Sequence, residues 1–334
     1  MTLLTQYSQI DANLWNQLIL DSHVSSWFQT REAYGFFDSL SFMEAFVVAV
    51  AEGDELLGVT AGYIQGDGGK LKQRLSRRAI IVGGPLLSEN ITDTQLSAML
   101  ITVRQLSKAK GCIYAETRNL NDYSRWRNIF EKCGFDYAPH YNFHIDTTDP
   151  NLVDKRMDKS RRRRIRRATE NGVVISNDLS HLPDFYNILS NLYRTKIHKP
   201  LPPYSMFEQL TKEPFARYFF VQSPDGKTIG GQVILMLEHR VAYAWYCCGM
   251  DREYHDLYPS IMANYAAIRY AADNDYERYD MMGGGTPGKD YGVRYFKAQF
   301  GGNLVEQGRY LYVCRPVIYW MGKTAMTIIN RLHK

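Results

Sequence analysis

The same order of predicted elements occurs twice along the chain, and this internal repeat limits the folds that are possible. In the first half, apolar runs predict three strands, a helix, a strand and a short helix, at residues 46–51, 56–65, 79–83, 94–110, 112–117 and 123–133. The second half repeats that order at residues 218–222, 230–237, 241–248, 259–273, 276–282 and 291–300. Solenoid repeats have periods of about 20–50 residues, so this longer period indicates two copies of one α/β module.

The repeat predicts the fold class and the division of the chain. A helix between two strands that lie side by side is a right-handed crossover in a mixed sheet. We therefore expect an α/β protein with two tandem modules, each a mixed twisted sheet flanked by helices. A length of 334 residues suits two domains. We place them at residues 1–150 and 151–334, with the second beginning at a basic helix.

Cysteine content and the absence of apolar segments indicate the compartment. The five cysteines form no CxxC pair and are odd in number, which suits free thiols in a reducing compartment. The first residues show no basic region followed by a long apolar run, and no stretch approaches the roughly 20 apolar residues that span a bilayer. We expect a cytoplasmic protein, and peripheral attachment at the inner membrane face stays open.

The net charge of +5 hides one strongly basic segment. Residues 155–172 contain nine basic and two acidic residues, a charge of +7, so the remaining chain sums to −2. Asp158 or Ser160 can cap this helix, and Asn171-Gly172 supplies its stop. One interpretation is a solvated connecting helix. The other is an anion site, because six arginines between 161 and 167 repel one another and arginine binds phosphate with a bidentate fork.

Residues 279–302, YDMMGGGTPGKDYGVRYFKAQFGG, contain the most informative motif. A strand ending at Asp280 is followed by a glycine-rich loop and a short helix. Gly283, Gly285 and Gly288 satisfy GxGxxG formally, but a dinucleotide site needs this pattern in the first strand-to-helix turn, so we expect a loop that lets a ligand approach the backbone. Arg294 and Lys297 lie three apart, on one side of the helix.

Metal and nucleophile chemistry has little support in the sequence. His140 and His144 are four apart, but the segment around them alternates like a strand, so we interpret both as structural. Cys247 and Cys248 fall in a strand, point to opposite faces and are interpreted as packing residues. No GxSxG or HExxH motif occurs. We expect no metal.

Several motifs together resemble the FemAB family of tandem GNAT-fold enzymes, which include peptidoglycan interpeptide-bridge aminoacyltransferases. They are SSWFQT at residues 25–30, KSRRRRIRRATENGV at the junction, and the Asp-x-x-Gly-Gly and Phe-Lys-x-x-Phe-Gly patterns at 280–301. The resemblance covers nearly the whole chain. It implies an acyltransferase with aminoacyl-tRNA as donor, a lipid- or nucleotide-linked cell-wall precursor amine as acceptor, and no bound cofactor. A shortened relative of the family could instead transfer another acyl group, to an amine of a surface-glycan precursor. The resemblance places Lys297 beside the substrate or the reaction centre.

These expectations assign roles to individual residues. Lys297 is the candidate for stabilising an oxyanion, and Asp280 for orienting or deprotonating the attacking amine. The candidate substrate-binding residues are Arg161, Arg164, Lys196, Tyr204, Gly283, Gly284 and Arg294.

The sequence leaves two alternatives. The first is a CoA-dependent GNAT N-acetyltransferase, which holds the acetyl-CoA pyrophosphate in a glycine-containing turn before a helix. The turn MDREYHDLYPS at residues 250–260 has no glycine, which favours the FemAB type of donor. The helical hairpin that some FemAB members use for tRNA is absent here. The second alternative is a non-catalytic module that binds nucleic acid or an anionic membrane through the basic helix.

Overall fold

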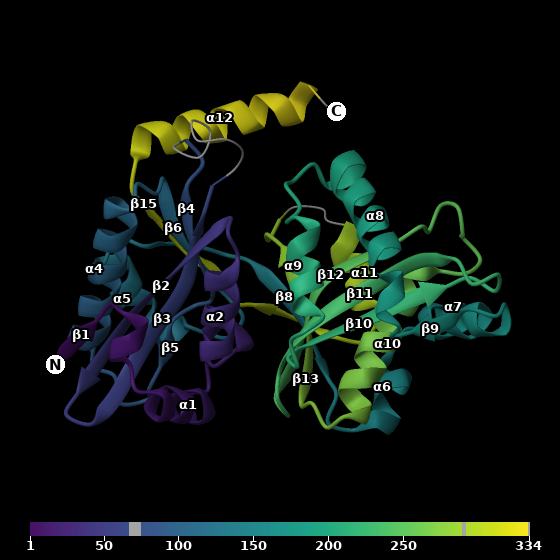
Figure 1. The fold of residues 1–334 in the computed structure, drawn as a ribbon, viewed down its shortest axis with the longest axis horizontal. Helices are drawn as coiled ribbons and strands as arrows, with labels where there is room; N and C mark the ends of the chain where they lie inside the picture. The colour runs from purple at the N-terminus through teal and green to yellow at the C-terminus, as the bar shows by residue number, and fades with distance from the viewer. Residues whose placement is uncertain (67–74, 289–291, 333–334) are drawn as a thin grey trace. The chain divides into compact units, whose positions relative to one another are not determined.

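The computed structural model describes residues 1–66, 75–288 and 292–332, and for residues 325–332 it describes the backbone alone. The chain divides into two compact units, residues 1–140 with 306–334 and residues 141–305. Each unit is a mixed sheet flanked by helices, as the repeat predicts (Figure 1).

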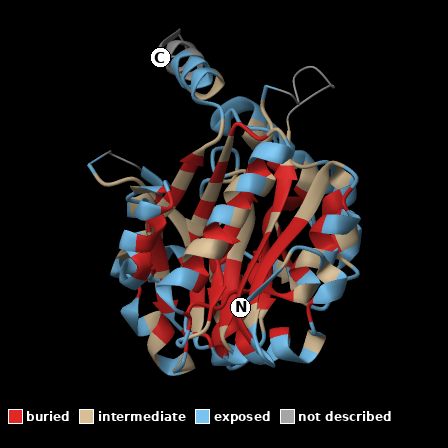
Figure 2. Cartoon of the chain, turned by 90° about the vertical axis from the view of Figure 1, so that its left-hand side faces the viewer, coloured by how far each residue is buried: buried red, intermediate tan, exposed pale blue. Residues whose placement is uncertain are grey.

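The first unit contains the strands and helices of the first repeat together with the end of the chain. Its helices are α1 (Ala12–Asp21), α2 (Arg31–Ser39), α4 (Asp93–Ala109), α5 (Arg127–Lys132) and α12 (Pro316–Leu332). Its strands are β1 (Thr2–Leu4), β2 (Met43–Glu52), β3 (Glu55–Gln65), β4 (Arg78–Gly83), β5 (Leu86–Leu87), β6 (Tyr114–Asn119), β7 (Asp136–Ala138) and β15 (Arg309–Val313). They are ordered β1-β2-β3-β4-β6-β15-β7, and β5 pairs with β3. Figure 2 shows these strands as a largely buried layer.

The second unit repeats this arrangement. Its helices are α6 (Pro150–Arg156), α7 (Lys159–Glu170), α8 (Leu182–Leu192), α9 (Tyr204–Leu210), α10 (Pro259–Asp273) and α11 (Gly292–Ala298). Its strands are β8 (Tyr141–Asp146), β9 (Val174–Ser176), β10 (Ala216–Gln222), β11 (Thr228–Leu237), β12 (Val241–Gly249), β13 (Arg278–Gly285) and β14 (Asn303–Glu306), ordered β14-β8-β13-β12-β11-β10-β9. The predicted helix at 291–300 is α11, although residue 291 lies outside the described residues.

One strand of each sheet comes from the other repeat. Strand β8 follows β7 in the chain but lies between β13 and β14, whereas β15 follows β14 but lies between β6 and β7. The two units therefore differ from the predicted division at residue 150. The difference arises because the last strand of each repeat pairs in the other repeat's sheet.

Helices cover both faces of the second sheet. Alternating residues of the strands separate the faces. One core contains Ile234 of β11, Tyr279 of β13 and Ile268 of α10, and it also includes residues of α6 and α7. On the opposite face, α8 and α9 pack their buried residues Phe185 and Phe207 against each other. Helix α7 buries only Arg161, Ile165 and Ala168, and its first turn is capped by Asp158 through the N–H of Ser160 (2.7 Å).

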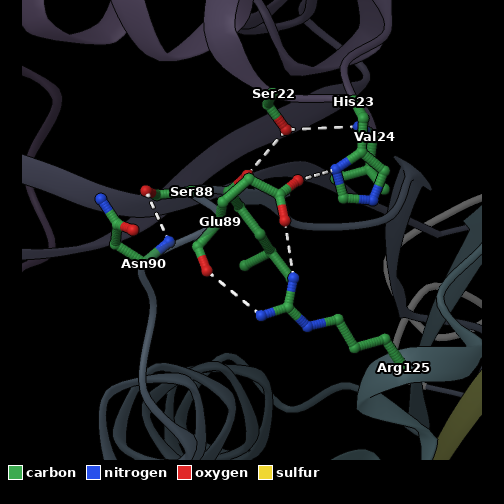
Figure 3. A network of polar contacts seen from close by, with 8 residues as sticks. Ser22, His23, Val24, Ser88, Glu89, Asn90 and Arg125 are labelled. Atoms are coloured by element: carbon green, nitrogen blue, oxygen red, sulfur yellow. Dashed lines mark hydrogen bonds and ion pairs between the residues drawn. The ribbon is translucent and has the colours of Figure 1, made fainter.

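A surface network in the first unit joins the turn after α1 to the loop before α4 (Figure 3). Glu89 contacts His23 and forms an ion pair with Arg125, whose Nη1 lies 2.6 Å from the carboxylate. Arg125 also donates to the Glu89 carbonyl (3.2 Å). All three side chains are about half exposed, so these pairs orient the loops and add little stability.

Among residues 1–66, 75–288 and 292–332, no helix has the length and apolar character needed to cross a membrane.

Candidate functional site

Strands β12 and β13 of the second unit pair for a short distance and then separate. They run parallel, and their pairing extends only from Val241–Arg278 to Tyr243–Asp280. Beyond that point both strands continue, and β12 has a register shift against β11 near Trp245. Facing strand edges that are not paired leave backbone N–H and C=O groups able to bind another extended chain. We call this region the strand gap.

The corresponding strands of the first unit show no such gap. Strands β4 and β6 stay paired from Arg78–Tyr114 to Gly83–Asn119, the full length of both. Their ends are held by Gln29, whose Nε2 donates to the Gly84 carbonyl (2.8 Å), and by Tyr123, whose hydroxyl lies 2.8 Å from the Gly83 carbonyl. Both side chains are buried. Residues 25–30, the SSWFQT motif, therefore close the first unit at the place where the second unit is open.

The predicted glycine loop is the end of strand β13. Gly283 pairs with Asn142 of β8, and Gly285 pairs with Tyr141. Glycine is needed here: Gly285 has φ +81°, and a Cβ on Gly284 would lie 3.1 Å from the Cβ of Tyr141. Strand β13 therefore extends to Gly285, beyond the predicted end at Asp280, and the loop begins at Thr286. The sequence did not reveal that β8 would pair with this segment, and the approach of a ligand to its backbone stays a prediction.

Lys297 of α11 reaches the backbone of β13 where the strand gap begins. Its Nζ donates to the carbonyls of Met281, Met282 (3.3 Å) and Gly283 (2.8 Å). An ammonium has three donors, so all are used within the chain. Burial lowers the pKa of Lys297 from 10.5 to about 8, although the negative charge of Asp280 acts in the opposite direction. The group therefore titrates close to physiological pH.

Asp280 is fully buried and lies next to His144, which we expected to be structural. Its Oδ1 accepts the N–H of Met282 (2.6 Å), which has the unusual φ of +56°. Its Oδ2 lies 3.3 Å from Nε2 of His144, and neither of these atoms has a hydrogen-bond partner. The Asp280 side chain has no exposed surface, and that of His144 is 13% exposed. Of this pair, only His144 has any exposed side-chain surface.

The position of His144 follows from the alternation of β8. Phe143 and Ile145 belong to the core that contains α10, so His144 and Asn142 face the other way, as does Asp280 between Tyr279 and Met281. The alternation was visible in the sequence. The alternation does not indicate that β8 pairs with β13, because β8 follows the first repeat in the chain and β13 belongs to the second.

Arg294 and Arg161 hold α11 in place rather than facing open solvent. Arg294 donates to the carbonyls of Gly284 (3.0 Å) and Thr286 (2.7 Å). Arg161 is only 1% exposed; its Nη2 donates to the Phe296 carbonyl (3.0 Å), and its guanidinium lies 4.4 Å from the Phe300 ring centre. Burial lowers the pKa of Arg161 to about 10. Its Nε and Nη1 are buried without a hydrogen-bond partner.

Of the remaining predicted residues, Arg164 lies on the α7 side of the second sheet, and Lys196 and Tyr204 lie on the α8–α9 side. Arg164 is exposed, with its guanidinium 5.8 Å from the ring centre of Tyr258. Lys196 is exposed in the π-helical turn that follows α8. Tyr204 begins α9, and its ring packs edge-on against Tyr186. The predicted residues therefore lie on both faces of the sheet, with the strand gap between them.

The N-terminus of α10 binds its own chain. The first helical residue is Pro259, which has no N–H. The N–H of Ser260 donates to the Asp251 carboxylate (3.0 Å), and the N–H groups of Ile261 and Met262 donate to the Tyr258 carbonyl (2.9 and 3.0 Å). The first turn thus offers no unpaired N–H to a phosphate, and its anion position is held by Asp251.

Helix α7 presents a basic surface. Lys159, Arg162, Arg163, Arg164, Arg166 and Arg167 are exposed. Two of them form ion pairs, Arg167 with Asp256 (2.8 Å) and Arg166 with Glu170 (3.5 Å). The positive charge that these two ion pairs do not neutralise favours an anionic partner at this surface.

Thiol and metal chemistry receive no support near the gap. Burial raises the pKa of Cys247 to about 12, so its thiol is not prepared to act as a nucleophile. Cys247 accepts from Asn264 of α10, whereas Cys248 contacts Phe185 of α8, so the two face opposite sides as predicted. In the described part of the chain, no three His, Cys, Asp or Glu side chains are grouped to hold a metal ion.

Comparisons with known proteins agree with the predicted fold. Residues 155–295, from α6 to α11, match the acetyltransferase (GNAT) domain family. The fold is similar to the crystal structure of FemX, at 15% identity over 96% of this chain and 99% of that chain, with a TM-score of 0.73. It is also similar to a tandem GNAT protein from the clavulanic acid biosynthesis pathway (11% identity, 94% and 98% of the two chains, TM-score 0.60).

A third similar structure is L-PGS from Bacillus licheniformis, at 12% identity over 90% of this chain and 91% of that chain, with a TM-score of 0.57. No curated protein sequence matches the chain. The two units therefore form a tandem GNAT fold like that of FemX, which confirms the fold that the resemblance to the FemAB family implied.

Proposed function

We propose that this protein is an acyltransferase that transfers an aminoacyl or acyl group to an amine of a cell-wall or surface-glycan precursor. The observation that carries the proposal is the strand gap of the second unit, with Lys297 at its start and Asp280 and His144 beside it. The fold around it is similar to that of FemX over nearly the whole length of both chains.

The two faces of the sheet suit two substrates. The α7 face carries the exposed arginines, and we assign it to the phosphates of the donor. The face of α8 and α9 carries His144 and Asp280, and we assign it to the acceptor amine. The substrates then meet in the strand gap, where the pairing of β12 with β13 ends.

The reaction needs an oxyanion stabiliser and a proton acceptor. The amine nitrogen attacks the ester carbonyl, a C–N bond forms, and the C–O bond to the donor breaks. Lys297 stabilises the oxyanion of the tetrahedral intermediate as an ammonium, by its positive charge and by turning one N–H away from the Met282 carbonyl, the most distant of its three partners. His144 takes the proton of the amine and returns it to the leaving oxygen, and Asp280 stabilises the imidazolium formed between these steps.

The α10 N-terminus supports aminoacyl-tRNA over acetyl-CoA as the donor. A CoA pyrophosphate bound at a helix start needs free backbone N–H groups, and here the Asp251 carboxylate occupies that position. The basic surface of α7 suits a polyanion such as tRNA. The acceptor is a lipid- or nucleotide-linked precursor in this proposal, and no bound cofactor takes part.

The experiment is a transfer assay with a choice of donors. Purified protein is given either a mixture of aminoacyl-tRNAs or acetyl-CoA, with nucleotide-linked and lipid-linked precursors as acceptors, and products are identified by mass spectrometry. The proposal expects an added aminoacyl mass with the tRNA donor. An added acetyl mass with acetyl-CoA alone would favour the CoA-dependent alternative. No transfer with any pair, together with salt-sensitive tRNA binding that disappears in Arg162→Glu/Arg163→Glu, would favour the non-catalytic module.

A further inference from the structure

Helix α12 extends from the end of the first unit's sheet and exposes the apolar side chains of Val317, Trp320 and Met321. It starts three residues after β15, at the top of Figure 1. The start of the helix is tied to the unit: the N–H of Arg315, just before the helix, donates to the Ile113 carbonyl (3.0 Å), and the ring of Tyr319 packs edge-on against that of Tyr114. Figure 2 shows the described part of the helix beyond its start as mostly exposed.

Three large apolar residues lie together on this helix. Val317 is 73% exposed, Trp320 57% and Met321 68%. Their spacing of three and four places them on one face, roughly opposite the face on which Tyr319 packs. Single exposed apolar residues are normal on a protein surface, but three neighbours that include a tryptophan form a patch that a partner would cover.

The charge around this patch has one sign. The sequence from residue 310 to 334 contains four basic residues, Arg315, Lys323, Arg331 and Lys334, and no aspartate or glutamate. The Lys323 ammonium lies 4.7 Å from the ring centre of Trp320, so a cation and an amphipathic aromatic ring sit together on the exposed part of the helix. Tryptophan and lysine in this arrangement are typical of residues at the headgroup level of a membrane.

We propose that α12 is an interfacial anchor that binds the surface of a membrane containing anionic phospholipid. Val317, Trp320 and Met321 enter the boundary between headgroups and acyl chains, while Lys323 and Arg315 contact lipid phosphates. The uniform positive charge selects this occupant, because an apolar partner protein would not require it and an anionic bilayer would. The inference does not depend on the proposed function, since it concerns an element outside the strand gap.

The test is flotation of the full chain with vesicles of stated composition. We expect binding to vesicles of phosphatidylcholine with phosphatidylglycerol, and binding weaker by about fivefold or more for vesicles of phosphatidylcholine alone. Trp320→Ser/Met321→Ser should weaken binding to the anionic vesicles by about tenfold or more, because the main apolar contacts are lost. Leu20→Ser is the matched control: Leu20 is 67% exposed, lies on α1 of the same unit, and should not affect binding.

Three outcomes would overturn the proposal. In the first, the wild-type protein does not float with anionic vesicles. In the second, the wild-type protein and the α12 double variant float equally well while Arg162→Glu/Arg163→Glu does not, which would assign membrane binding to α7. In the third, wild-type protein is a dimer without lipid and the α12 variant is a monomer, which would make a second copy of the chain the occupant. Unchanged thermal unfolding of the exposed-residue variants shows that a loss of flotation is not a loss of fold.

Discussion

The ammonium of Lys297 has two functions in this account, and one substitution separates them. It satisfies the carbonyls of Met281, Met282 and Gly283 in the resting protein, and it stabilises the oxyanion during transfer. Lys297→Met retains the aliphatic stem but removes the donors. We expect kcat/KM to fall by about 10²–10³, and the free energy of unfolding to fall by about 1–3 kcal/mol, because three carbonyls lose a charged partner.

Lys297→Arg is the control for charge. It restores a cation and donors at the same place, so it should recover most of the lost stability and part of the rate. Steady-state kinetics and urea unfolding of both variants provide the comparison. If Lys297→Met loses stability and retains its full kcat/KM, Lys297 serves only to hold β13.

The pKa of Lys297 predicts the pH dependence of the reaction. Burial lowers this pKa to about 8, so the group is charged below that pH and neutral above it. An oxyanion stabiliser must be protonated, and kcat/KM should therefore decrease as the pH rises through about 8. In Lys297→Arg this decrease should disappear, because a guanidinium stays charged. A rate that instead rises through pH 8 would mean that Lys297 acts as a base.

Among the elements, α10 makes the clearest prediction. Its first-turn N–H groups are used by Asp251 and Tyr258, so acetyl-CoA should not bind tightly to the free protein. Isothermal titration is the measurement. Binding in the micromolar range, about −8 kcal/mol, would contradict the assignment of the donor. Asp251→Ala, which removes the carboxylate from this position, tests whether the capping side chain is what excludes the phosphate.

The elements themselves could be predicted from sequence because their signals are local. The helical spacing of Leu96, Met99 and Val103 predicts α4, and Gly111, which has φ +72°, predicts the end of that helix. The site could be predicted only in part. Lys297 and Asp280 came from the motif at residues 279–302, and their catalytic roles stay predictions, as does the anion-binding role of Arg161. The sequence did not indicate that Arg161 would be buried. Its burial against Phe296 and Phe300 depends on contacts between distant segments.

For the whole molecule, the exchange of β8 and β15 predicts that the two repeats do not fold separately. Tyr310 of β15 is 1% exposed, and its ring stacks on Phe130 at 4.0 Å. A chain that ends at residue 305 lacks this strand, so β6 and β7 lose the partner between them. We expect the first unit to lose its cooperative unfolding transition. A chain that ends at residue 315 keeps β15, lacks α12 and should unfold like the full protein.

Urea unfolding followed by tryptophan fluorescence compares these chains, because Trp15, Trp27 and Trp126 all lie in the first unit. A chain ending at 305 with an unchanged transition would show that β15 is dispensable. The sequence could not predict this exchange. The alternation of Tyr141–Asp146 fixes which residues share a face, but it does not determine which sheet the strand joins.

The central claim is that acyl transfer takes place in the strand gap of the second unit. The most direct measurement is single-turnover transfer from aminoacyl-tRNA to the precursor, comparing wild type with Lys297→Met and with Lys132→Met, which removes an exposed lysine from the first unit. We predict that Lys132→Met transfers at the wild-type rate and that Lys297→Met is slower by about 10²–10³. Equal rates for all three proteins would contradict the account, because the chemistry would then lie outside the gap.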